Sequence, residues 1–112
     1  MEIGFRRYKD VYIVDVQGDM DLYNAHELKD VINKLIDKKI SKIVINLESV
    51  DYIDSSGVGA LIHIFTSVKR NGYKLRITNV HGSVAKVIKL TKLMGYFPIV
   101  EDVKTALHEL SA

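Results

Sequence analysis

The 112-residue sequence contains no cysteine and a single proline, and its formal net charge is only +2. Without cysteine, disulfide bonds, thiol catalysis and cysteine-ligated zinc are excluded. The first residues lack the apolar segment of a signal peptide, and no apolar run is long enough to cross a bilayer. The weak net charge gives no sign of direct nucleic-acid binding. We therefore expect a cytoplasmic protein with no direct nucleic-acid or membrane partner.

Composition and length indicate one globular domain. Apolar residues make up 47% of the chain and charged residues 27%, which is ordinary for a folded protein. The chain is long enough to bury a core but too short for a second domain, and it shows no linker, internal repeat or low-complexity segment. We expect residues 1–112 to form a single domain.

The apolar pattern alternates between strand and helix periodicity. Short β-branched or alternating runs predict strands at 3–8, 11–16, 42–47, 74–80 and 97–100. Apolar residues at spacings of three and four predict four helices, which follow the first hairpin and each later strand. Pro98 assigns the last strand to an edge. The expected fold class is α/β, a mostly parallel five-stranded mixed sheet with about four helices in the order β-β-α-β-α-β-α-β-α.

Polar residues mark the expected helix ends. Asn24, with Glu27 three residues later, is typical of a capping box at the start of the first helix. Ser83 is expected to cap the third helix, whose apolar face continues to Met94 and stops at Gly95.

Two strand-to-helix loops, 18–24 and 48–59, are rich in polar side chains. In a parallel sheet, sites form beyond the carboxyl ends of the strands. If the strands before these loops are neighbours, both loops face the same side. Their candidate site residues are Asp19, Asp21, Asp51, Asp54, Ser55 and Ser56.

Enzyme motifs in these loops are incomplete. The hydrolase nucleophile elbow around Ser55 requires glycine where Ile53 stands. The D-x-D pattern at 19–21 lacks the further acidic residues and the lysine of a phosphotransferase. Neither a dinucleotide fingerprint nor a phosphate-binding loop occurs, and the four histidines lack metal-ligand spacing. We therefore expect no catalytic, cofactor-binding or metal-binding residues, and no enzyme activity.

The segment YIDSSGVG, residues 52–59, stands where a buried strand passes into a helix. Asp54 or Ser55 can cap that helix, and glycines can permit close helix–sheet packing. Capping does not explain Gly57 and Gly59, since each costs about 1 kcal/mol of helix propensity relative to alanine. An exposed serine beside small residues suits the approach of another protein, such as a kinase or phosphatase.

Together with Leu47 and Val50, the segment 52–59 closely resembles the signature of the anti-sigma factor antagonists, the stand-alone proteins of the STAS domain family. The segment GDMDLYNAHEL at 18–28 is similar to the other characteristic loop and first helix of that family. The resemblance extends over nearly the whole chain and includes the order of its strands and helices. It implies a STAS-like fold.

The resemblance also implies a function. Ser55 would be phosphorylated by the binding partner itself, an anti-sigma factor with serine kinase activity. The unphosphorylated protein would bind that kinase and release the sigma factor, phosphorylation would end the binding, and a serine phosphatase would reset the cycle. No cofactor is implied, and we expect a monomer when free. The partner-binding residues would be Asp21, Asp54, Ser55, Ser56, Gly57, Val58 and Gly59.

Two other functions stay open at this point. One is a STAS scaffold subunit of a larger signalling assembly, phosphorylated but without a sigma factor. The other is a STAS accessory subunit of a transporter, including lipid-transport systems.

Overall fold

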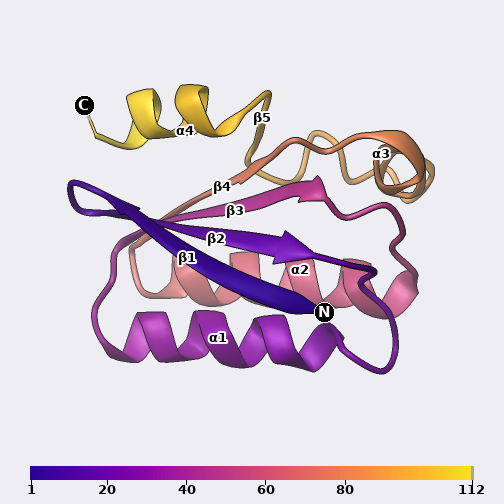
Figure 1. Ribbon diagram of the computed structural model, residues 1–112, viewed down its shortest axis with the longest axis horizontal. Helices are drawn as coiled ribbons and strands as arrows, with labels where there is room; N and C mark the ends of the chain where they lie inside the picture. The colour runs from indigo at the N-terminus through magenta and orange to yellow at the C-terminus, as the bar shows by residue number, and fades with distance from the viewer. Residues whose placement is uncertain (112) are drawn as a thin grey trace.

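Five strands form one mixed sheet in the order β1-β2-β3-β4-β5, and helices cover both of its faces (Figure 1). This computed structural model describes residues 1–111. β1 and β2 are antiparallel, whereas β2, β3, β4 and β5 are parallel to one another. The strands are β1 Glu2–Tyr8, β2 Val11–Gln17, β3 Lys42–Ser49, β4 Lys74–Thr78 and β5 Ile99–Val100. The helices are α1 Ala25–Asp37, α2 Ser55–Arg70, α3 Gly82–Leu90 and α4 Val103–Leu110. The element order and fold class predicted from the sequence are confirmed.

The core is divided by the sheet into a large and a small part. α1 and α2 lie side by side on one face of the sheet, and α4 lies on the other (Figure 1). β3 is central and contributes to both parts, with Ile43 and Ile45 on the α1–α2 side and Val44 on the α4 side. All three side chains are fully buried. This two-sided burial explains why the sequence of β3 is almost continuously apolar.

The capping box predicted at the start of α1 is wrong. Asn24 does occupy the N-cap position, but its side chain makes no bond to the helix. Its Oδ1 instead accepts from the backbone N–H of Asp21 at 2.9 Å, and its Nδ2 donates to the carbonyl oxygen of Asp19 at 2.8 Å. The side chain is therefore used to shape the loop before the helix.

The third helix is also shorter and starts earlier than predicted. α3 follows His81 at the N-cap position, so Ser83 lies inside its first turn, where its hydroxyl donates to the carbonyl oxygen of Asp51 at 2.5 Å. The helix ends at Leu90, and Met94 lies in the turn that follows. Lys92 ends the helical path because its φ of +62° turns the chain into the left-handed region.

A polar row lies on the same face of the sheet as α4, in the part that this helix does not cover. The guanidinium of Arg6 on β1 forms a two-pronged ion pair with Asp15 on β2, with N–O distances of 2.6 and 2.8 Å. Asn46 on β3 donates to the same carboxylate at 2.8 Å. The bond from Arg6, followed by that from Asn46, holds the pKa of Asp15 below its ordinary value of 3.8 despite partial burial. These bonds connect three strands through one carboxylate.

We expect Asp15→Asn to lower the free energy of unfolding by about 1 kcal/mol at neutral pH, a value reduced by solvent screening because Arg6 is half exposed. Because folding lowers the pKa of Asp15, its contribution is complete above the ordinary pKa and is lost as the pH falls through the lower, folded pKa. The difference between variant and parent should therefore shrink below about pH 4. Urea unfolding at several pH values measures it, with Asp37→Asn, an exposed position, as the charge-matched control. An equal difference at every pH would contradict this assignment.

Candidate functional site

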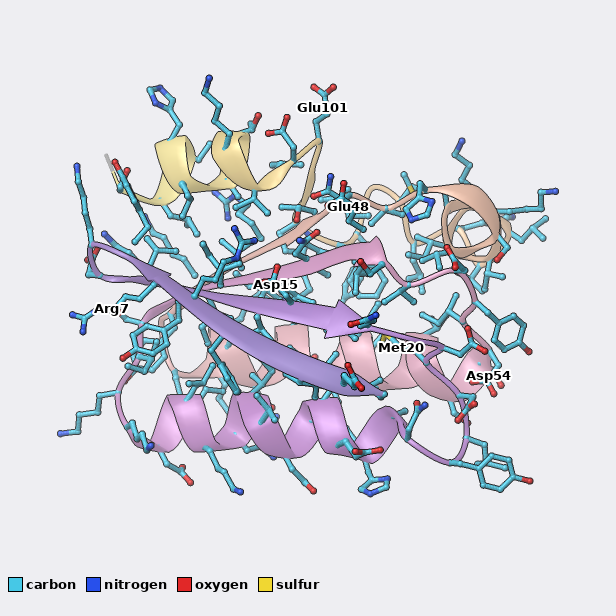
Figure 2. All side chains as sticks on the ribbon, viewed as in Figure 1. Arg7, Asp15, Met20, Glu48, Asp54 and Glu101 are labelled. Atoms are coloured by element: carbon cyan, nitrogen blue, oxygen red, sulfur yellow. The ribbon has the colours of Figure 1, made fainter. Side chains whose placement is uncertain are left out.

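The loops at 18–24 and 48–54 meet beyond the carboxyl ends of β2 and β3. The strands are parallel neighbours, and the pairing continues past them as a parallel bridge between Met20 and Ile53. The N–H of Met20 donates to the carbonyl oxygen of Tyr52 at 3.0 Å. The N–H of Asp54 in turn donates to the carbonyl oxygen of Met20 at 3.1 Å. Figure 2 shows Met20 and Asp54 at the same end of the molecule. The predicted convergence of the two loops is confirmed.

Asp54 caps α2 and also holds the neighbouring loop. Its Oδ1 accepts from the backbone N–H groups of Ser56 at 2.8 Å and Gly57 at 3.1 Å. Its Oδ2 accepts from the N–H of Leu22 at 3.1 Å, across 32 positions of the sequence. From the sequence, either Asp54 or Ser55 could cap α2, and the structure assigns the cap to Asp54.

Ser55 is therefore the first residue of α2 rather than its cap. It is exposed, whereas Ser56 is partly buried. The first turn of α2 contains no acidic side chain, and the dipole of the 16-residue helix gives this end a partial positive charge. The site thus presents a neutral hydroxyl at a helix end that favours negative charge.

The two glycines of the segment have different surroundings. A Cβ on Gly57 would lie 2.5 Å from Cγ1 of Ile53 and 2.8 Å from the carbonyl oxygen of Met20, so the residue is small because α2 packs directly on both loops. A Cβ on Gly59 would meet no atom of the described residues within 4 Å, and Gly59 is exposed. The side chain of Val58 is only 4% exposed and belongs to the core. Gly57 and Val58 can therefore shape the predicted binding surface but cannot contribute side-chain area to it.

Asp21 organises the loop before α1. Its Oδ1 accepts from the N–H groups of Tyr23 at 2.9 Å and Asn24 at 3.2 Å, and its carbonyl oxygen accepts from Ala25 at 2.9 Å. The residue is half-buried. Asp21 and Asp54 thus each use their carboxylate to fix the loop at 18–24, which brings that loop beside Ser55.

Three exposed apolar residues of the site were missed by the sequence reasoning. Leu22 is 68% exposed, Tyr23 83% and Tyr52 48%, and all three lie on the two converging loops. Scattered exposed apolar residues are normal on a protein surface, but large ones in loops that also contain a polar site are typical of interaction surfaces. Their presence within otherwise polar loops was a signal available in the sequence.

Among residues 1–111, no three histidine, aspartate or glutamate side chains lie close enough together to hold a metal ion. None of the helices in this part of the chain is both long and apolar enough to span a membrane.

An α/β domain with this topology has known counterparts. Residues 2–106 match the model of the STAS domain, and the chain belongs to that family. The anti-sigma-B factor antagonist of Staphylococcus aureus is 30% identical over 82 residues, which cover 73% of this chain and 76% of that protein. The resemblance inferred from the sequence is confirmed.

Solved structures agree with this assignment. A candidate anti-sigma factor antagonist from Thermotoga maritima superposes with a TM-score of 0.90 at 25% identity, covering 98% of this chain and 95% of that one. The Bacillus protein SpoIIAA shares the fold in its unphosphorylated form, with a TM-score of 0.73, 14% identity and coverage of 98% and 97%. The phosphorylated form of SpoIIAA has the same fold, with a TM-score of 0.74 at 16% identity, covering 99% of this chain and 100% of that one.

We expect Gly57→Ala and Gly59→Ala to change stability in opposite directions. The methyl group at position 57 would overlap the backbone of Met20 and should cost about 1–3 kcal/mol. The same methyl group at position 59 enters open space and should gain about 0.5–1 kcal/mol of helix propensity. Thermal and urea unfolding of the two variants measure both effects. If Gly57→Ala were as stable as the parent, the close packing of α2 on the loops would be disproved.

Proposed function

We propose that this chain is an anti-sigma factor antagonist whose binding is switched by phosphorylation of Ser55. The unphosphorylated form binds an anti-sigma factor with serine kinase activity, and so frees the sigma factor. Phosphorylation of Ser55 by that kinase ends the binding, and a serine phosphatase restores it. The observation that carries this proposal is the exposed Ser55 at the start of α2, held beside the loop at 18–24 by Asp54. The name of the Staphylococcus aureus relative supports the same function.

The phosphoryl group must come from another protein. The sequence contains neither a phosphate-binding loop nor a dinucleotide fingerprint. Kinases position nucleotide phosphates with such loops, or with lysines and magnesium, before transferring a phosphoryl group. This chain acts as the substrate and binding partner in the proposed cycle, and not as an enzyme.

The start of α2 can accept a phosphate without loss of the fold. A phosphoserine carries about −1.5 to −2 charges at neutral pH, and the dipole at the N-terminus of a helix favours an anion at this end. Ser55 is exposed, so the added group displaces no core side chain. That SpoIIAA has been solved with this fold in both forms is consistent with a switch that leaves the fold intact.

The same phosphate should be unfavourable inside an interface. Neither loop, 18–24 or 48–59, contains lysine or arginine, while each contains aspartates. Asp54 precedes the acceptor directly, and the exposed Asp51 lies on the same loop. A dianion buried among these groups would find no cation on this surface to compensate it. Repulsion and desolvation would then act together against the bound state.

Exposed apolar side chains supply the attractive part of the proposed surface. Leu22 and Tyr23 lie on the loop that Asp54 fixes, and Tyr52 lies on the other loop. Aromatic residues are enriched among those that dominate binding energy, because they bury a large area with few rotatable bonds. The proposed interface therefore consists of Ser55 and these apolar anchors.

The first test of the function is phosphorylation by anti-sigma-type serine kinases from the source organism, purified singly and incubated with ATP. We expect one of them to add a single phosphate to Ser55 and not to the partly buried Ser56. Burying the dianion should cost about 3–5 kcal/mol, so affinity for that kinase should fall roughly a hundredfold or more. Ser55→Ala should bind and resist release, while Ser55→Asp should weaken binding less than phosphate does. Peptide mapping and calorimetric titration measure these effects.

The thermal midpoint of the phosphorylated form should change only slightly, because the helix end accepts the anion. Equal affinities of the two forms would disprove the switch, and a large fall in melting temperature would mean that phosphorylation acts by unfolding. Stable binding to a transporter subunit or a signalling scaffold, with no kinase bound, would overturn the proposed function itself.

Leu22→Ala should lower the affinity for the same kinase about tenfold or more, and Tyr23→Ala should do the same, because each removes an anchor from the interface. The matched control is Leu90→Ala on α3, a leucine that is 77% exposed and lies outside both loops. Melting curves should be unchanged in all three variants, since these side chains are largely solvated. If Leu22→Ala and Leu90→Ala bind equally well, the apolar anchors play no part in recognition.

A further inference from the structure

The two edges of the sheet differ in how well they are protected. β5 forms one edge, contains only two residues and follows Pro98. β1 forms the other edge, contains seven residues, and has neither proline nor a register shift in its pairing with β2. In Figure 1 β1 is the strand of the sheet nearest the viewer, and no helix lies over it. A long, regular edge strand presents unpaired backbone groups that can bind another strand.

The hairpin decides which backbone groups of β1 point outward. Tyr8 pairs with Val11 across the two-residue turn, so this closing pair is hydrogen-bonded. Such pairs alternate along an antiparallel ladder. Gly4, Arg6 and Tyr8 therefore direct their N–H and C=O groups to β2, whereas Ile3, Phe5 and Arg7 direct theirs to the open edge.

The outer edge of β1 is complementary to itself. If two copies pair antiparallel with Gly4 on the two-fold axis, Ile3 lies opposite Phe5 of the second copy, and these residues supply the free backbone groups. Phe5 is 55% exposed within one chain and would gain an apolar neighbour. The same register sets Glu2 opposite Arg6 of the second copy, which pairs opposite charges. A shift that puts Phe5 on the axis would instead place Ile3 opposite Arg7.

We propose that two copies of this chain form an isologous dimer by antiparallel pairing of their β1 strands, with Gly4 at the two-fold axis. The occupant of the edge is a second copy because one register satisfies the backbone, apolar and charged groups together. The contact is limited to one strand from each copy, so the dimer is weak and concentration-dependent. This differs from the monomer expected from the sequence. No residue of the Ser55 loops takes part, so this inference does not depend on the proposed function.

Cross-linking tests the register directly, because the chain has no cysteine of its own. Gly4 would face Gly4 of the second copy in a non-hydrogen-bonded pair, with Cα atoms about 4.5 Å apart, which is within the range of a disulfide. Among residues 1–111, nothing lies within 4 Å of a Cβ at this position, so Gly4→Cys should fold. Mild oxidation at high protein concentration should convert most of Gly4→Cys to a dimer. Phe5→Cys should remain mostly monomeric, since the two positions would be more than about 7 Å apart. Cross-linking of Phe5→Cys in place of Gly4→Cys would overturn the register.

Charge reversal tests the dimer without new covalent bonds. Glu2→Arg places two arginines opposite each other and should raise the dissociation constant at least tenfold in sedimentation-velocity experiments over a concentration series. Glu101→Arg is the control, with the same change of charge on an exposed residue that follows β5 at the far edge (Figure 2). Circular dichroism should show both variants folded. A parent protein that stays monomeric at millimolar concentration, or equal association of the two variants, would overturn the proposal.

Discussion

The bonds of the Asp54 carboxylate are the constraint on which the arrangement of the site depends. One oxygen satisfies two N–H groups at the start of α2, and the other holds the N–H of Leu22. Helix N-termini leave such N–H groups without partners inside the helix, and at α2 the side chain of Asp54 supplies the missing acceptor. Because the same side chain reaches the neighbouring loop, the start of α2 and the loop at 18–24 form one unit. Their close packing leaves room only for glycine at position 57.

This unit separates structural from exposed residues over a few positions of the sequence. Gly57 and Val58 face inward, while Ser55 and Gly59 face solvent. A chemical change at the exposed positions can therefore alter the surface while leaving the core unchanged. That separation is what a reversible binding switch needs, because affinity must change by several kcal/mol in a protein whose total stability is only about 5–15 kcal/mol. It is the physical basis of the proposed regulation at Ser55.

The sheet also separates the proposed binding site from the proposed contact between copies. The Ser55 loops lie beyond the carboxyl ends of β2 and β3, whereas the contact between copies uses the outer edge of β1. The polar row of Arg6, Asp15 and Asn46 connects β1 to the centre of the sheet. β1 is thus a firmly held strand with a free outer side. Two surfaces of different chemistry, one of loops and one of backbone groups, can act on the same small domain.

The sequence by itself determined the element order, the two-sided burial of β3 and the family, because apolar periodicity and the segment 52–59 are local patterns. It also indicated that the two loops would converge, since parallel neighbours end on the same side. The sequence could not show that Asn24 turns back to the loop, that α3 ends at Leu90, or that Gly57 and not Gly59 is required by packing. Each of these depends on an atom that is distant in sequence or on a competing local bond. Only the tertiary structure decided them, because side-chain partners and free space are properties of neighbours in space and not of neighbours along the chain.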